Sequence, residues 1–136
     1  MKKRLLLAVV LGALGVVGAV VVHQTRPGEG SILPPCLFHE VTGFHCAGCG
    51  ITRAVHALLH LRVGEALAMN PLVVAALPLI LLGVVIESLA WIMGEAYRGP
   101  RVRLPAWAHW LLLVTILAYW ILRNIPAWPF SLLAPH

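Results

Sequence analysis

Charged residues are scarce in this sequence. Only 11% of its 136 residues are Asp, Glu, Lys or Arg, whereas 60% are apolar and the mean hydropathy is +0.91. A soluble domain of this size covers its surface with charged and polar side chains, and ten basic plus five acidic residues are too few for that. In a bilayer, apolar side chains can face lipid instead of water. The composition therefore argues against a soluble domain and predicts an all-α integral membrane protein, with a single membrane domain over residues 1–136.

The sequence also lacks a basic stretch suited to nucleic acid, although its formal net charge is +5. Three of its ten Lys and Arg residues lie at positions 2–4, and three more lie within 98–103. Basic residues grouped at the ends of apolar runs are typical of membrane proteins, whereas a nucleic-acid site needs a basic surface. We therefore expect membrane lipid as a partner, leave room for a membrane-protein partner, and expect no nucleic acid.

Three apolar runs predict transmembrane helices at about 5–22, 72–93 and 106–122. The first run has a basic start and no Ala-x-Ala cleavage site, so it predicts a retained anchor rather than a cleaved signal peptide. Asn70 and Pro71 suit the beginning of the second run, because Asn caps a helix and Pro fits its first position. Aromatic residues near both ends of the third run suit the membrane interface.

The basic residues also predict the orientation of the three spans. Cytoplasmic connections are enriched in Lys and Arg, so the N-terminus and the 95–105 connection are expected on the cytoplasmic side. The segment 23–71 then lies outside, where its three Arg residues are balanced by three Glu residues. We therefore expect a multi-pass protein of the cell inner (plasma) membrane with an extracytoplasmic cysteine loop.

The cysteine loop is expected over 23–50, because Pro and Gly residues there interrupt both helix and strand. From Ile51 the pattern changes to a helical period and predicts an amphipathic interfacial helix over 51–64. Its apolar face consists of Ile51, Ala54, Val55, Leu58 and Leu59. Its polar face carries Arg53, His56 and His60, and we expect the two histidines to face water or lipid headgroups.

The cysteines are few, odd in number and confined to this loop. Cys46-x-x-Cys49 precedes the predicted helix, and a helix N-terminus can lower the pKa of a nearby thiol. Cys46 and Cys49 are therefore candidate catalytic residues of a membrane thiol–disulfide oxidoreductase, with Cys36 as a third thiol for a mixed or resolving disulfide. An extracytoplasmic site suits this chemistry, because disulfides persist there.

A metal site is a second interpretation of the same cysteines. The Cys-x-x-Cys-Gly pattern is similar to one knuckle of a zinc ribbon. Its ligands would be Cys36, Cys46, Cys49 and His45, or His39 in place of His45. A second knuckle is missing from the sequence, and Gly rather than His follows the pair, which excludes the c-type haem attachment pattern. Zinc is thus the one cofactor that the sequence suggests.

A disulfide from Cys36 to Cys46 or Cys49 is a third interpretation. It would staple a loop that has little core of its own and would stabilise it by about 2–4 kcal/mol. One thiol stays unpaired in any such scheme, because the number of cysteines is odd. Our first hypothesis is a stabilised binding or interaction element without enzymatic activity, and the redox and zinc alternatives stay open.

Two further charged residues have structural interpretations. We expect Arg53 to pair with Glu40 or Glu65; binding of a lipid phosphate and stabilisation of a nearby thiolate are the alternatives. Glu87 lies within the second span, where an acid costs roughly 2.5–3.5 kcal/mol on insertion scales, and we expect it to reach toward Arg98 or Arg101.

These motifs resemble the bacterial membrane-protein family filed as domain of unknown function 2752. The resemblance covers residues 34 to about 126, and it includes the Asn-Pro pair before the second span and Arg-Asn-Ile-Pro after the third. The residues that carry it are Cys36, Thr42, Gly43, Cys46, Gly48, Cys49, Gly50, Thr52, Arg53, Asn70, Pro71, Arg123 and Asn124. Ala47 and Leu37 stand where the family commonly has proline. The resemblance implies a small multi-span membrane protein with a shared site in the cysteine segment, and it implies no particular activity.

Overall fold

The structure is a computed structural model that describes residues 2–25 and 36–134. Within these residues every regular element is a helix, in agreement with the all-α prediction. The elements are α1 (Lys2–Gln24), α2 (Leu37–Thr42), α3 (Ile51–Leu59), α4 (Val63–Met69), α5 (Pro71–Met93), η1 (Gly94–Ala96), α6 (Ala106–Leu122) and η2 (Phe130–Leu133).

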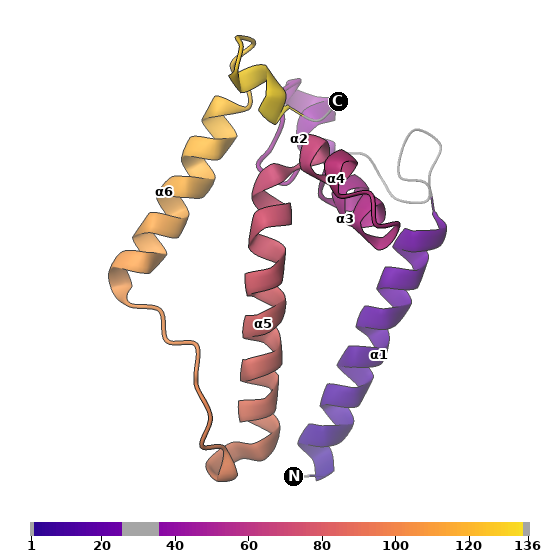
Figure 1. Ribbon diagram of the computed structural model, residues 1–136, viewed down its shortest axis with the longest axis vertical. Coiled ribbons are helices and arrows are strands. Elements are labelled where there is room, and N and C mark those ends of the chain that lie inside the picture. Colours follow the sequence, from indigo (N-terminus) through magenta and orange to yellow (C-terminus); the bar gives the residue numbers. More distant parts are fainter. Residues whose placement is uncertain (1, 26–35, 135–136) are drawn as a thin grey trace.

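Three long helices run along the length of the molecule, and the short helices gather at one of its ends (Figure 1). In this view α5 lies between α1 and α6. The helices α2, α3 and α4 lie at the upper end together with η2, whereas the start of α1 and the connection from α5 to α6 lie at the lower end. The cysteine segment therefore lies at the end opposite the N-terminus.

Two of the helices, Lys2–Gln24 and Pro71–Ala96, are long and apolar enough to cross a membrane. None of the residues in their most apolar segments is buried inside the protein, unlike those of a core helix in a soluble domain. α6 is also apolar but has only 17 residues. The three long helices cover the apolar runs predicted at 5–22, 72–93 and 106–122.

The buried core is small and lies beneath the cysteine segment. Ala54 and Ala57 of α3 pack against Ala66 of α4, with Leu58, Met69 and Val74 around them. Small side chains let α3 and α4 approach closely, so the two short helices form one compact unit on the start of α5. Large apolar residues elsewhere stay exposed, for example Leu79 at 72% and Trp110 at 69%.

The second long helix begins and ends where the sequence predicts. The Asn70 side chain accepts a hydrogen bond from the Val73 N–H at 3.1 Å, and Pro71 occupies the first helical position. Gly94 follows the last residue with a φ of 58°, a value that favours glycine. The helix continues through Pro78 without a break.

The single helix predicted over 51–64 is instead two helices. α3 ends at Leu59, and α4 begins at Val63, so Gly64 lies inside a helix rather than at its end. Leu61 reverses the chain with a φ of 58°, and the Arg62 N–H donates to the Ala57 carbonyl at 2.8 Å. The prediction missed this turn because no glycine or proline marks it, and the packing of alanines across it selects the reversal.

The predicted cysteine loop, 23–50, also contains more structure than expected. α1 extends to Gln24, and α2 forms from Leu37 to Thr42. Gly43 ends α2 in the left-handed region with a φ of 74°. The Pro and Gly residues within 26–35, on which the loop prediction depended, lie outside the described residues.

Glu87 contacts the connection between α5 and α6 differently from the prediction. Its Oε1 accepts a hydrogen bond from the Val102 backbone N–H at 2.7 Å. Its partner in the 98–103 segment is therefore a backbone amide rather than an arginine. The backbone N–H gives the carboxylate a charge-assisted hydrogen bond near the end of the span.

Candidate functional site

The three cysteine sulfurs form one cluster at the upper end of the molecule. Cys36 lies just before α2, whereas Cys46 and Cys49 lie in the turn that leads into α3. The sulfur of Cys46 is 3.4 Å from that of Cys36 and 3.3 Å from that of Cys49. All three sulfurs lie within 4.8 Å of one another, so the structure brings together every thiol of the chain.

The turn between Cys46 and α3 depends on glycine. Gly50 directly precedes α3 with a φ of 85°, a conformation that side chains with a Cβ rarely adopt. A Cβ on Gly48 would lie 3.4 Å from Ile51 Cδ1 and 3.7 Å from the Cys46 sulfur. The glycines of the motif therefore shape the turn around the sulfurs.

The two threonines of the motif lie at the edge of the cluster. The Thr42 hydroxyl donates to the Phe38 carbonyl at 2.6 Å and accepts from the Phe44 N–H at 3.2 Å, which ties the end of α2 to the next segment. Thr52 is half-buried in the first turn of α3. Neither residue provides a sulfur-facing hydrogen bond in the described contacts, and the role of Thr42 is to close α2.

Arg123, directly after α6, binds the backbone of the cysteine turn. Its side chain is only 1% exposed. Nη1 donates to the Cys46 carbonyl at 3.0 Å and to the Ala47 carbonyl at 3.2 Å, and Nη2 donates to the Cys49 carbonyl at 3.1 Å. The guanidinium lies over the Tyr119 ring, with 5.0 Å between Cζ and the ring centroid. One guanidinium thus binds three carbonyls of the turn.

Asn70 binds two of the same carbonyls from the start of α5. It is fully buried, and its Nδ2 donates to Ala47 at 3.0 Å and to Cys49 at 3.2 Å. Its Oδ1 accepts from the Tyr119 hydroxyl at 3.2 Å in addition to the Val73 N–H. The helix cap predicted from sequence is therefore also a contact between α5, α6 and the cysteine turn.

Asn124 completes this set of contacts. Its Oδ1 accepts from the His45 N–H and its Nδ2 donates to the His45 carbonyl, both at 2.8 Å. Nδ2 also donates to the Trp120 carbonyl at 2.8 Å. Asn124 therefore joins the end of α6 to the backbone of His45, next to the cysteine turn.

The thiols of Cys36 and Cys49 differ in acidity. The pKa of Cys36 is lowered, mainly because the backbone N–H of His39 in the first turn of α2 favours the thiolate. Burial raises the pKa of Cys49 to about 12, and hydrogen bonds with the neighbouring thiols act in the same direction. The Cys46 N–H donates to the Cys49 sulfur at 3.2 Å. Without a bound cation, the acidic thiol of this pair is therefore Cys36.

The histidines expected as a fourth metal ligand do not join the cluster. Among the described residues, the group of candidate ligand atoms within 4.8 Å of one another consists of the three sulfurs. The rings of His39 and His45 stack on each other, with 4.4 Å between their centroids. Burial lowers the pKa of His45, and the positive charges of His39, Arg123 and Arg53 lower it further. His45 is therefore a neutral neighbour of the site.

Among the described residues, Arg53 forms no ion pair with Glu40 or Glu65, the partners expected from sequence. Glu65 instead pairs with Arg62 at 2.9 Å, because residues three apart at the start of α4 are neighbours on the helix surface. The Arg53 side chain is exposed on α3. The arginine that reaches the cysteine turn is Arg123, 74 to 77 residues away in the chain.

The spacing of the sulfurs fits a metal ion. A tetrahedral zinc ion with Zn–S bonds of about 2.3 Å places its sulfur ligands roughly 3.8 Å apart. The two sulfur distances of 3.3 and 3.4 Å are within about 0.5 Å of this value, and all three sulfurs lie within 4.8 Å of one another. Zinc would supply the charge that converts these thiols to thiolates, and Cys36, Cys46 and Cys49 would hold it.

The charge of Arg123 also fits a metal ion bound by the three thiolates. Among the described residues its bonds go to neutral carbonyls, and its Nε is buried without a hydrogen-bond partner. A buried charge is costly unless an opposite charge lies nearby. Three thiolates and one divalent cation carry a net charge of −1, which would offset the +1 of the guanidinium.

Together these features define a small all-helical chain with two membrane-length helices and a three-thiol turn bound by the ends of its long helices. Residues 36–84 match the model of the family described as a protein of unknown function, DUF2752, which confirms the resemblance seen in the sequence. The matched segment contains the three cysteines, Asn70 and Pro71. No curated protein and no solved structure matches the chain.

Proposed function

We propose that this chain is a small multi-pass membrane protein that binds zinc, or another thiophilic metal ion, through Cys36, Cys46 and Cys49. The site is a stabilised binding element at the extracytoplasmic end of three spans. Soft thiolate ligands favour Zn²⁺ and Cu⁺ over hard cations such as Mg²⁺. The three sulfurs leave a fourth zinc position for water or for a ligand brought by a partner.

The exposed apolar surface supports three spans. α1 and α5 reach membrane length without any burial of their most apolar segments. α6, with 17 residues, is about 26 Å long, close to the hydrocarbon thickness of a bilayer. Large apolar patches of this kind are rare on soluble monomers, so lipid is the environment that accounts for them. The short helices α3 and α4 would then lie at the membrane interface.

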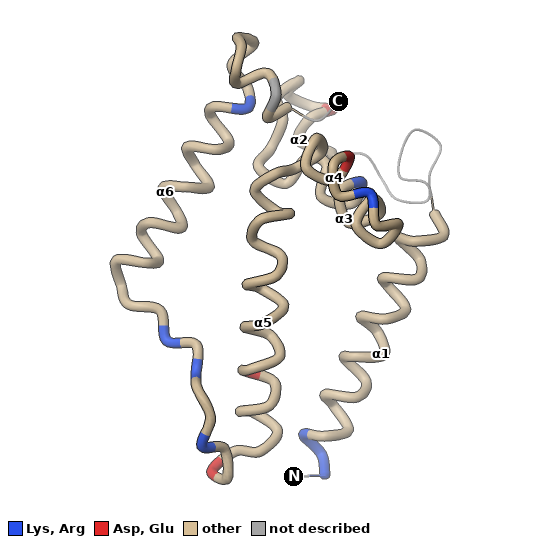
Figure 2. Tube along the Cα trace, viewed as in Figure 1, with Lys and Arg blue, Asp and Glu red and all other residues tan. Residues whose placement is uncertain are grey.

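The charge distribution supports an extracytoplasmic cysteine site. Basic residues mark the start of α1 and the connection between α5 and α6, both at the lower end of the molecule (Figure 2). At the upper end, basic and acidic residues both occur near α3 and α4. Because Lys and Arg are enriched on the cytoplasmic side, the lower end is expected inside the cell.

The observation that carries the metal proposal is the combination of clustered sulfurs and an uncompensated guanidinium. A disulfide between two of the cysteines would leave the Arg123 charge without a counter-charge among the described residues. A metal–thiolate centre supplies one. The contacts of Arg123, Asn70 and Asn124 hold the turn without using a sulfur as their acceptor, so the sulfurs stay available to a ligand.

Metal analysis of the full-length protein, purified in detergent under reducing conditions, tests this proposal. We expect one zinc ion per chain and, after exchange with Co²⁺, intense sulfur-to-cobalt charge-transfer absorption. Serine substitution of Cys36, Cys46 or Cys49 should abolish both signals. His45→Ala is the matched control, because His45 is next to the turn but outside the sulfur cluster, and this variant should keep its metal. Metal-free protein with three reactive thiols would overturn the proposal.

Thiol–disulfide exchange is a second candidate, favoured by the lowered pKa of Cys36 and its 3.4 Å distance to Cys46. In this reaction the Cys36 thiolate would attack a partner disulfide and release one partner thiolate. Cys46 would then attack the Cys36 sulfur, which forms a Cys36–Cys46 disulfide and releases the second partner thiolate. The partner gains two electrons, and the cysteine pair loses them.

The redox candidate differs from the Cys46–Cys49 couple predicted from sequence, because a pKa of about 12 makes Cys49 a poor nucleophile. Thiol trapping in redox buffers of graded potential distinguishes the two candidates. A reversible Cys36–Cys46 couple in metal-free protein would support exchange. Thiols that titrate together with bound zinc, and become reactive only when a chelator removes it, would support the metal site.

A further inference from the structure

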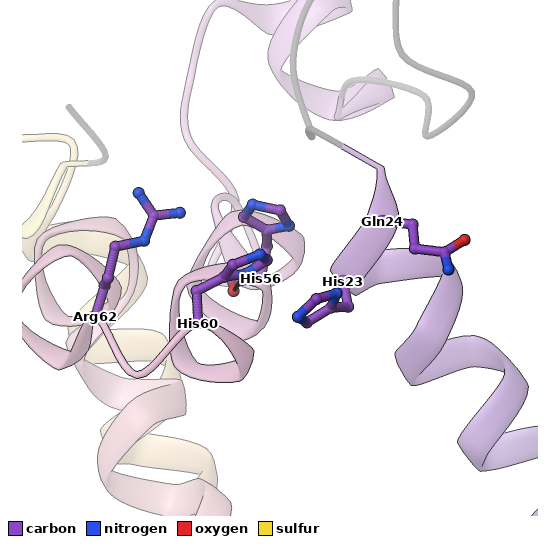
Figure 3. A pocket seen from close by; sticks show the side chains of 5 residues that line it. All are labelled: His23, Gln24, His56, His60 and Arg62. Atoms are coloured by element: carbon purple, nitrogen blue, oxygen red, sulfur yellow. Dashed lines mark hydrogen bonds between the residues drawn. The ribbon is translucent and has the colours of Figure 1, made fainter.

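A second polar site lies between the end of α1 and the polar side of α3. It is a pocket with a volume of about 520 Å³, lined by His23, Gln24, His56, His60 and Arg62. Figure 3 shows the His23 ring extending from α1 toward His60 and His56 on α3, with Arg62 beyond His60. The Gln24 side chain points away from the three rings. The metal proposal uses none of these residues.

The three imidazole rings lie next to one another. The rings of His23 and His60 stack, with centroids 4.1 Å apart and an interplanar angle of 11°, whereas the His56 ring lies 4.4 Å from His60 and is tilted by 37°. Ring nitrogens lie in the planes of the rings, so parallel rings do not aim their lone pairs at one common point. This geometry argues against a metal ion held by all three rings.

Two of the rings have defined donor atoms. His56 Nδ1 lies 2.7 Å from the Val22 carbonyl, and His60 Nδ1 lies 2.9 Å from the His56 carbonyl. A carbonyl oxygen can only accept, so each Nδ1 carries a proton, and these bonds leave each Nε2 for a ligand. The Val22 carbonyl belongs to the last turn of α1, so this bond fixes the His56 ring against the end of that helix.

The charge of the lining is positive. None of the described residues that line the pocket is acidic, and Arg62 carries a permanent charge. Glu65 pairs with Arg62, but both side chains are about half exposed, and such surface pairs contribute about 0–1 kcal/mol. The Arg62 guanidinium therefore stays available to an anion in the pocket.

We propose that this pocket binds a phosphate group, carried either by a lipid headgroup or by a soluble phosphate. A phosphate presents acceptor oxygens to the Arg62 guanidinium, which forms charge-assisted hydrogen bonds with them, and a P–OH group of the phosphate donates to the free Nε2 of His56 or His60. A volume of about 520 Å³ accommodates a phosphate together with part of a headgroup. The pocket lies at the end of a membrane-length helix, the depth at which headgroups lie if α1 spans the bilayer.

Equilibrium binding to the full-length protein in phosphatidylcholine nanodiscs tests this proposal with two probes, fluorescent phosphatidic acid and radiolabelled inorganic phosphate. His60→Gln and Arg62→Gln should each weaken binding by about tenfold, the loss of roughly one charge-assisted hydrogen bond. His109→Gln is the matched control, because His109 Nδ1 also bonds a backbone carbonyl, that of Pro105 at 3.1 Å, but on α6. Its affinity should not change.

The two probes distinguish the sources of the phosphate. Binding of phosphatidic acid without binding of inorganic phosphate assigns the pocket to a lipid headgroup, and binding of both assigns it to a soluble phosphate. Equal affinities of wild type, His60→Gln and Arg62→Gln, or no binding of either probe, would overturn the proposal. Cys36→Ser should retain phosphate binding, so a failure of the metal site is distinguishable from a failure of this pocket.

Discussion

The contacts of Asn70 and Arg123 with the cysteine turn predict strong energetic coupling between these two residues. Both side chains donate to the Ala47 carbonyl and to the Cys49 carbonyl, and both are almost completely buried. Removing one side chain leaves each carbonyl with its other partner. Removing both leaves two buried carbonyls without these donors.

The expected magnitudes follow from these partners. Arg123→Met loses hydrogen bonds from a charged donor but relieves the cost of burying that charge, so we expect a loss of about 2–3 kcal/mol in the free energy of unfolding. Asn70→Ala should cost about 2–4 kcal/mol, because the Val73 N–H and the Tyr119 hydroxyl also lose their acceptor. The double variant should be less stable than the sum of both losses by about 1–3 kcal/mol.

A double-mutant cycle measures this coupling by SDS titration of the four proteins in mild detergent micelles, followed by tryptophan fluorescence. Thr115→Val with Arg123→Met is the control pair, because among the described residues the Thr115 hydroxyl bonds the Leu111 carbonyl of its own helix, at 2.8 Å. That pair should be additive within about 0.5 kcal/mol. Additivity of Asn70→Ala and Arg123→Met within the same limit would refute the shared-carbonyl arrangement.

Three further predictions concern Gly50, the Cys49 thiol and the orientation of the spans. Gly50→Ala should destabilise the protein by about 1–2 kcal/mol in the same titration, because a φ of 85° is unfavourable for alanine, whereas Gly12→Ala in α1 has open space and should not. Metal-free protein should lose stability as the pH rises from about 8.5 toward 12, because the folded state raises the pKa of Cys49 to about 12 and keeps its proton, whereas an unfolded thiol loses it. In unfolding titrations across this range, the loss of stability with pH should be smaller in Cys49→Ala than in wild type. A reporter that needs an extracytoplasmic location should be active when it is fused after residue 136, and a reporter that needs the cytoplasm should be inactive there. Activity of the cytoplasmic reporter would contradict three spans with a cytoplasmic N-terminus.

The long helices were predictable because local signals define them. Three apolar runs mark their lengths, and the Asn-Pro pair and Gly94 mark the limits of α5 through requirements of the backbone itself. The turn between α3 and α4 has no such signal. Leu61 adopts a positive φ there because alanine packing across the two helices outweighs the preference of one residue. A prediction from sequence periodicity alone therefore treats α3 and α4 as one helix.

The composition of the cysteine site was predictable, but its supports were not. The spacing of Cys46 and Cys49 and the third cysteine were visible in the sequence, and their convergence follows from a short loop. Arg53, close in sequence and next to the motif, was the natural candidate for a supporting charge, and it is exposed. Arg123 is the residue that is buried against the turn, a contact over more than 70 residues that no local pattern encodes.

The position of Arg123 links the chemistry of the site to the packing of the helices. Asn70 begins α5, Arg123 and Asn124 end α6, and all three bind backbone atoms of 45–49. Along its length, α6 is mostly exposed, and its buried contacts concentrate at this end. A metal ion that converts the thiols to thiolates places negative charge near the Arg123 guanidinium. The attraction between these charges favours the packing of the end of α6 against the cysteine turn. By the same linkage, loosening α6 should weaken metal binding, so the cysteine turn is both the candidate binding site and the main contact between the last helix and the rest of the protein.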